Sequence, residues 1–306
     1  MICIIFVGIF LHFKTHNIVY LYTKYITAFY TTQLNFRKFK AYPTSLLSWY
    51  LILINFMPAN SITEVIVQLT EIVEKSRREN SQLGYFAALY RKVTIRIRDG
   101  IAKREFDDNE RMERLDVIFA NRYIDAYNAF KSNQTPTQSW SIAFIASQNT
   151  NLLILQHLLL GINAHINLDL GIAAAQAVGD GKIQHLKNDF DKINSILAEM
   201  VDDVQSRLGK ASPVFGILDP LTKRLDEDLA NFTIGQARDG AWKFANAVFV
   251  AKASDLNELI KERDIRIALL AKNLASPGSG WMRSVISFIR FFATKNVSKV
   301  IDLLAA

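Results

Sequence analysis

A mostly apolar stretch, HLLLGINAHINLDLG at residues 157–171, carries side chains that can do chemistry. Four of its residues are spaced four apart and would form one ridge on an α-helix: His157, Gly161, His165 and Asp169. A histidine beside a carboxylate can act as a general acid or base, and the same pair can ligate a divalent metal ion. Gly161 leaves room for a ligand or another backbone to approach the ridge. A second ridge lies on a different side of the helix: Asn163, Asn167 and Gly171.

Two charged residues on other predicted helices lie among apolar ones. Asp116 projects between Phe119 and Tyr123, and Arg238 lies beside Trp242. A charge that is buried without a partner costs several kcal/mol, so both groups need a partner inside the protein. We therefore expect these groups to meet one another, a ligand or a metal ion.

Two interpretations of the polar residues make the protein non-catalytic. In the first, the residues form a structural network, in which Asp116 or Asp169 satisfies Arg238 and the remaining carboxylate fixes the ring of His165. In the second, the chain is a helical interaction module whose polar core only sets the packing of the helices. Under either interpretation it is a binding or structural protein.

Two other interpretations give the residues a chemical role. A metal site would hold one Zn, Fe or Mn ion, whose bound water serves hydrolysis, with these ligands: His165, Asp169, Asp116 and His157, and Asp189 as a further candidate. Metal-free acid–base chemistry or small-ligand binding would use His165 tuned by Asp169, with Arg238 holding an anionic group. The candidate catalytic residues are His165, Asp169, Asp116 and Arg238. The leading prediction is a soluble helical protein with a buried His/Asp/Arg site, for which metal-dependent hydrolysis is one candidate reaction, and the alternative is a non-catalytic binding or structural protein.

Several common sites are missing from the sequence. It contains no Walker loop, no GxSxG elbow, no GxGxxG motif after a strand pattern and no EF-hand loop, so cofactors that need these signatures have no support. The one cysteine, Cys3, rules out an intramolecular disulfide and, over residues 57–306, Cys-ligated zinc and thiol catalysis. His185 lies beside Lys187 near the start of a predicted helix, and we expect it to be exposed.

The elements that must position these residues are helices. From residue 61 onward, apolar residues recur at spacings of three and four, and no alternating strand pattern is present. The predicted helices cover residues 61–79, 83–103, 109–131, 138–147, 150–177, 182–208, 222–250, 255–275 and 280–303, the last with a break near Thr294. The helix at 150–177 is apolar on nearly all sides, which predicts that it is buried at the centre. We predict one all-α domain over residues 57–306, packed around this helix.

The first 56 residues differ from the rest of the chain. They hold five basic residues and no acidic one, and their apolar runs are about half of the ~20 residues that a membrane-spanning helix needs. After them, Ser61 and Glu64 form a capping-box pattern, in which Ser61 caps a helix and Glu64 reaches back to the cap amide. We predict that residues 1–56 are a non-native or dispensable extension and that Met57 is the functional start. A weak membrane-surface anchor is the alternative.

The distribution of charge argues against a nucleic-acid partner. The chain has a formal charge of +7, but five of the positive charges lie in residues 1–56, and the signs are nearly balanced over the remainder. We expect a cytoplasmic protein with no membrane span, whose partner is an unknown small molecule. The basic, amphipathic stretch 280–303 favours a helix docked on the body, with weak association with a membrane surface as the alternative.

Four stretches of the chain resemble a known family: LGYFAALYRKVT (83–94), RMERLDVIFANRYIDAY (111–127), LLLGINAHINLDLGIA (158–173) and NFTIGQARDGAWKFA (231–245). They are similar to a bacterial family catalogued as domain of unknown function 5995. The resemblance covers nearly all of residues 61–275, and AHINLDL is its most specific part. The family has no assigned activity, so the resemblance implies a globular helical unit and no mechanism.

A fainter resemblance is to the all-helical zinc-dependent phospholipases C and related nucleases, in which a His and an Asp recur along a buried helix. Their trinuclear zinc site needs many more ligands than the three histidines of residues 57–306 provide. This resemblance implies a place for one metal ion and not for a trinuclear site.

Overall fold

Every regular element that the structure describes is a helix. The computed structural model describes residues 57–211, 234–276, 287, 290–291 and 293–306, and in these ranges it contains no β-strand, which confirms the predicted all-α class. Residues Asn55–Ala306 form one compact unit. Residues 1–56 lie outside the described residues, so the predictions made for them stay predictions.

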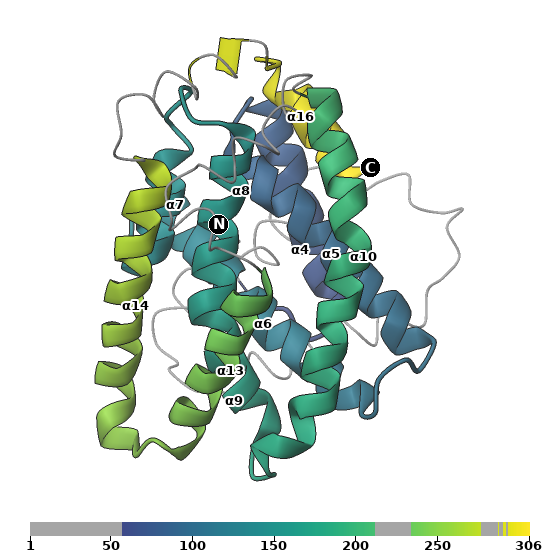
Figure 1. The fold of residues 1–306 in the computed structure, drawn as a ribbon, viewed down its shortest axis with the longest axis vertical. Helices are drawn as coiled ribbons and strands as arrows, with labels where there is room; N and C mark the ends of the chain where they lie inside the picture. Colours follow the sequence, from purple (N-terminus) through teal and green to yellow (C-terminus); the bar gives the residue numbers. More distant parts are fainter. Residues whose placement is uncertain (1–56, 212–233, 277–286, 288–289, 292) are drawn as a thin grey trace, which may run out of the picture. The chain divides into compact units, whose positions relative to one another are not determined.

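Figure 1 shows how the described helices are arranged. In the order of the sequence they are α4 (Ile62–Arg78), α5 (Leu83–Ala102), α6 (Asn109–Lys131), α7 (Gln138–Ala146), α8 (Ile154–Ala164), the π-helical turn η1 (His165–Asp169), α9 (Leu170–Val178), the 3-10 turn η2 (Ile183–Leu186), α10 (Lys187–Ala211), α13 (Ile234–Val250), α14 (Ala253–Ala275) and α16 (Val297–Ala305). The start of the predicted helix 222–250 and much of the predicted helix 280–303 lie outside the described residues.

The first described helix begins at the predicted cap. The hydroxyl of Ser61 accepts a hydrogen bond from the backbone N–H of Glu64 (3.2 Å), as the capping-box pattern predicted. The carboxylate of Glu64 reaches back one residue further than predicted, because it accepts from the N–H of Asn60 (2.8 Å) and not from that of Ser61. One free donor in the first turn of α4 and the amide that precedes the cap are therefore satisfied by side chains.

The central helix consists of three consecutive pieces, α8, η1 and α9, from Ile154 to Val178. The helices α5, α6, α7, α13 and α14 pack against these pieces and bury them on nearly all sides, as predicted. Within the part of the chain that the structure describes, Ile154–Val178 is the one helical stretch long and apolar enough to cross a membrane, and it is mostly buried inside the protein. The predicted helix 150–177 is observed from Ile154 to Val178, with the π-helical turn η1 in its middle.

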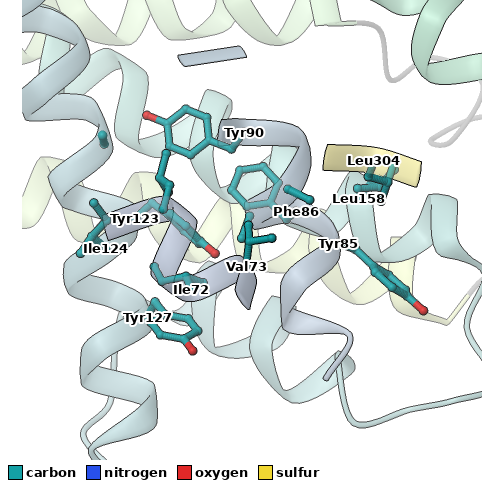
Figure 2. Close-up of a cluster of buried hydrophobic side chains, with 14 of the residues drawn as sticks. Ile72, Val73, Tyr85, Phe86, Tyr90, Tyr123, Ile124, Tyr127, Leu158 and Leu304 are labelled. Carbon is teal, nitrogen blue, oxygen red and sulfur yellow. The ribbon is translucent and has the colours of Figure 1, made fainter. Parts of the chain in front are cut away.

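The core between α4, α5, α6 and α8 is rich in aromatic side chains (Figure 2). Its buried members include Ile72, Val73, Tyr85, Phe86, Tyr90, Tyr123, Ile124, Tyr127, Leu158 and Leu304. The ring of Phe86 occupies the space that Gly161 leaves, since a Cβ at position 161 would lie 2.5 Å from that ring. At Gly171 the close approach is by the backbone of α13, because a Cβ there would lie 2.9 Å from the carbonyl oxygen of Ala241.

The last helix, α16, docks on the body of the protein. Val300, Ile301 and Leu304 are buried on its inner face, and α16 packs against α4, α5 and α10. Residues 294–296 before it are not helical, which confirms the predicted break near Thr294. Residues 297–305 of the stretch 280–303 are therefore docked on the body of the protein.

Candidate functional site

The predicted His–Asp pair lies on the π-helical turn η1. The backbone N–H of Leu170 donates to the carbonyl of His165, five residues back, in place of the α-helical bond to the fourth residue. Such turns are rare and often occur at functional sites. The turn changes the rotation per residue, yet the Nδ1 atom of His165 and the Oδ2 atom of Asp169 lie 3.4 Å apart, so the two side chains are neighbours as predicted.

Asp169 is the centre of a buried hydrogen-bond network. Its side chain is 1 % exposed, and its carboxylate accepts from the Nε of Arg122 at Oδ1 (2.8 Å) and from the indole N–H of Trp140 at Oδ2 (2.7 Å). Burial alone would raise the pKa of Asp169, but the charge of Arg122 and the hydrogen bonds from His165 and Trp140 lower it overall. The carboxylate is therefore ionised and joins α6, α7 and η1.

His165 is neutral and has one free ring nitrogen. Burial lowers the pKa of this residue, and the hydrogen bond and charge of Asp169 offset the effect only in part. A neutral imidazole that donates from Nδ1 to Asp169 has an unprotonated Nε2, and Nε2 is buried without a hydrogen-bond partner. The ring stacks on Phe119, with 3.5 Å between ring centroids, and Tyr90 meets it edge-on at 4.4 Å.

Two more buried polar atoms belong to Tyr90 and Asp116. The Oδ2 of Asp116 is buried and has no hydrogen-bond partner, and the buried hydroxyl of Tyr90 makes no hydrogen bond of normal geometry. Burial raises the pKa of Tyr90 well above its usual value, and the charges of Asp116 and Asp169 raise it further, while an interaction with the side chain of Thr94 lowers it in part. Burial, with a contribution from Glu113, also raises the pKa of Asp116 to about 7. We call the following six residues the buried polar cluster: Tyr90, Asp116, Arg122, Trp140, His165 and Asp169.

Arg238 does not pair with either predicted carboxylate. Its guanidinium lies over the ring of Phe190, 4.3 Å from the centroid, and its Nη2 donates to the backbone carbonyl of Phe190. Burial lowers the pKa of Arg238 to about 10. The predicted pairing with Asp116 or Asp169 was wrong, because Arg122 of α6 binds Asp169.

The remaining candidates lie apart from the His–Asp pair or serve other purposes. His157 faces Tyr85, with 5.7 Å between ring centroids, and both its ring nitrogens lack partners. Burial, followed by the charge of Arg290, lowers the pKa of His157 to about 4. Asp189 accepts from the backbone N–H groups of Asp107 and Asp108 and from the guanidinium of Arg111, so it holds the turn before α6. His185 is exposed, as predicted.

The predicted metal ligands are not gathered. Among the described residues, no group of three or more His, Cys, Asp or Glu side chains is placed to hold a metal ion. His165 and Asp169 supply two donors, but Asp169 already accepts from Arg122 and Trp140. The chemistry that this arrangement supports directly is proton transfer, because a neutral histidine held by a carboxylate can accept a proton at Nε2.

Sequence reasoning did not identify Arg122 and Trp140 as members of the cluster. A buried tryptophan needs an acceptor for its indole N–H, so Trp140 carried a usable signal. Arg122 carried a weaker one, since the long side chain of an arginine at the edge of an apolar helix face can reach inward. Nothing in the spacing separates Arg122 from Arg238 as a partner for Asp169.

Comparison with known proteins identifies a family and no individual relative. No curated protein matches the chain, and no solved structure matches it. The model of the family described as "Family of unknown function (DUF5995)" matches residues 62–277, which include all six residues of the buried polar cluster. The chain therefore belongs to the DUF5995 family.

Proposed function

We propose that the protein binds a small polar molecule at the buried polar cluster, and that His165 exchanges a proton with this molecule without the help of a metal ion. One observation carries the proposal: the Nε2 of His165 and the Oδ2 of Asp116 are buried and unpartnered, and the buried hydroxyl of Tyr90, which interacts with the side chain of Thr94, makes no hydrogen bond of normal geometry. Each such atom costs about 1–3 kcal/mol when it lacks a hydrogen bond. A polar ligand that pairs with them would remove this cost.

The protonation states of the cluster indicate the chemistry of the ligand. The charge of Asp169 is balanced by Arg122, and His165 is neutral, so the site favours a ligand without net charge. Nε2 of His165 accepts a hydrogen bond, and the hydroxyl of Tyr90 can donate one. The walls are aromatic, with Phe86 and Phe119 beside the His165 ring. These features suit a small molecule with a hydroxyl or amide group.

Arg122 suggests a route from the surface to the cluster. Its side chain is 25 % exposed, while its Nε lies 2.8 Å from the buried Asp169. Phe119, which stacks on His165, is also only partly buried. The cluster is therefore one layer of side chains below the surface, and rotation of Phe119 and Arg122 would open it.

A purely structural role is the second candidate. Asp169 joins three elements through Arg122, Trp140 and His165, and this favours a network that fixes the packing of the helices. The two candidates differ in what they predict for Tyr90, because a hydroxyl without a hydrogen bond of normal geometry contributes little to a structural network.

A thermal-shift screen of small polar molecules against the full chain tests the proposal. We expect a compound that raises the melting temperature of the wild type and of Tyr85→Phe, which alters another buried tyrosine of α5. We expect no such rise in Tyr90→Phe or His165→Gln. Tyr90→Phe alone should fold with unchanged or higher stability, because it removes a buried hydroxyl without a hydrogen bond of normal geometry.

Three outcomes would contradict the proposal. A broad screen without any stabilising compound would favour the structural role. Binding that persists in both Tyr90→Phe and His165→Gln would place the ligand elsewhere. Stoichiometric transition metal in the purified protein, lost in both His165→Gln and Asp169→Asn while the fold is kept, would restore the metal-site prediction.

A further inference from the structure

Two residues of the second ridge of the central helix, Asn163 and Asn167, face α14. The side-chain amide of Asn163 donates to the carbonyl of Ile267 (3.1 Å), and that of Asn167 donates to the side-chain oxygen of Asn163 (3.0 Å). Arg263 donates its Nε to the backbone carbonyl of Asn167 (2.9 Å), inside the π-helical turn. Helix α14 is thus hydrogen-bonded to the turn that carries His165 and Asp169.

Asp264, the next residue of α14, is hydrogen-bonded to α7, the helix that carries Trp140 of the buried polar cluster. Asp264 is buried, and its carboxylate accepts from the backbone N–H groups of Gln138 (2.7 Å) and Ser139 (3.0 Å) and from the Ser139 hydroxyl (2.7 Å). These bonds cap the first turn of α7. Trp140, whose indole N–H donates to Asp169, lies in that same turn.

We propose that Arg263 and Asp264 are positioning residues for the His165–Asp169 pair. Arg263 holds the turn η1, Asp264 holds the start of α7, and these two elements meet at Asp169. Because the two residues are adjacent on one helix, they fix the distance between the Trp140 donor and the Asp169 acceptor. A π-helical turn is rare, and the bond from Arg263 ties the backbone of this turn to α14.

The positioning role of Arg263 and Asp264 does not depend on the proposed function. Only one consequence rests on that function, namely that ligand binding needs the His165–Asp169 pair in place. A merely structural role for Arg263 and Asp264 predicts lower melting temperatures and an unchanged His165–Asp169 pair in the folded state. A positioning role predicts a changed pair in protein that is still folded.

Nuclear magnetic resonance of the full chain separates these roles without any ligand. The nitrogen-15 resonances of the His165 ring report which nitrogen carries the proton. Hydrogen exchange of the Trp140 indole N–H reports its bond to Asp169. The test variants are Arg263→Gln and Asp264→Asn, and the controls are Arg266→Gln and Glu262→Gln, two exposed positions of the same helix.

We expect both test variants to shift the His165 ring resonances toward a mixture of the two neutral forms. We also expect exchange of the Trp140 indole N–H about tenfold faster, the ratio that follows from losing the net strength of one hydrogen bond. The control variants should leave both signals unchanged. If Arg263→Gln does not fold, Arg263→Lys, which keeps the positive charge but removes the Nε donor, provides the same comparison.

Wild-type His165 and Trp140 signals in folded Arg263 and Asp264 variants would overturn the inference. Changed signals together with a failed ligand screen would support the positioning role and reject the proposed function. The two ideas can therefore fail separately.

Discussion

Asp116 and His165 are buried groups that both favour their uncharged forms. Burial raises the pKa of Asp116 to about 7 and lowers that of His165 below its usual value. The ion pair of Asp169 with Arg122 is therefore the main charged element of the cluster near neutral pH. Asp116 changes its charge in the range where a general acid is useful.

At the residue scale, Asp116→Asn should reduce the pH dependence of stability between about pH 4 and 7. The pKa of Asp116 rises from 3.8 to about 7 on folding, so the folded wild type binds more protons in this window. Its stability therefore falls as the pH rises through the window and levels off above pH 7. Asparagine does not titrate and removes this component.

Urea unfolding of both proteins at several pH values measures the difference, with Asp255→Asn, at an exposed position of α14, as the control. The same slope of unfolding free energy against pH in wild type and Asp116→Asn would show that Asp116 is not the group responsible.

For the buried polar cluster, the burial of some residues could be predicted from the sequence, but their partners could not. The spacing of His165 and Asp169 and the apolar surroundings of Asp116 predicted that these residues are buried, and the structure confirms their burial. The partner of Asp169 could not be predicted, because it depends on which helices are adjacent and in what register. Arg122 and Arg238 fit the local pattern equally well, and only tertiary packing places Arg122 beside η1.

At the element scale, the glycines of the central helix are sites of close contact. Gly171→Ala should destabilise the protein by about 1–3 kcal/mol, because the added Cβ would lie 2.9 Å from a backbone oxygen of α13, which cannot rotate away. Gly209→Ala in α10 is the matched control, since nothing lies within 4 Å of its Cβ position.

The control should raise stability by about 0.5–1 kcal/mol, as alanine does in place of a helical glycine. Chemical denaturation of the three proteins measures both changes. Equal effects of the two substitutions would mean that α13 does not pack tightly on α9.

Apolar periodicity predicted several helices closely and missed the π-helical turn. The predicted helix 109–131 matches α6, and 138–147 differs from α7 by one residue. The turn at His165–Asp169 leaves no mark in the apolar pattern, because the central helix is apolar on nearly all sides and a change of rotation exposes no polar residue. The contacts from α14 that hold the turn are tertiary and come from a distant part of the sequence.

At the scale of the whole molecule, the last described helix, α16, packs against the first two described helices, α4 and α5. Ile301 of α16 is fully buried and lies against Gly84 of α5, where a Cβ would approach it to 2.5 Å. Ile301→Ala should therefore destabilise the whole unit by about 2–5 kcal/mol.

Val250→Ala, at an exposed position at the end of α13, should change stability little. Thermal unfolding followed by circular dichroism gives both values. A local loss of α16 at low temperature, with an unchanged main transition, would show that α16 is not part of the cooperative unit.

The buried stretch Ile154–Val178 also has a consequence for biosynthesis. Its covering helices α13 and α14 are made later, since they end at Val250 and Ala275. At a translation rate of about 5–20 residues per second, the delay between Val178 and the end of α14 is roughly 5–20 s. During that interval a segment apolar enough for a lipid bilayer is outside the ribosome and lacks two of its covering helices. The nascent chain therefore exposes, for some seconds, apolar surface that the folded protein buries.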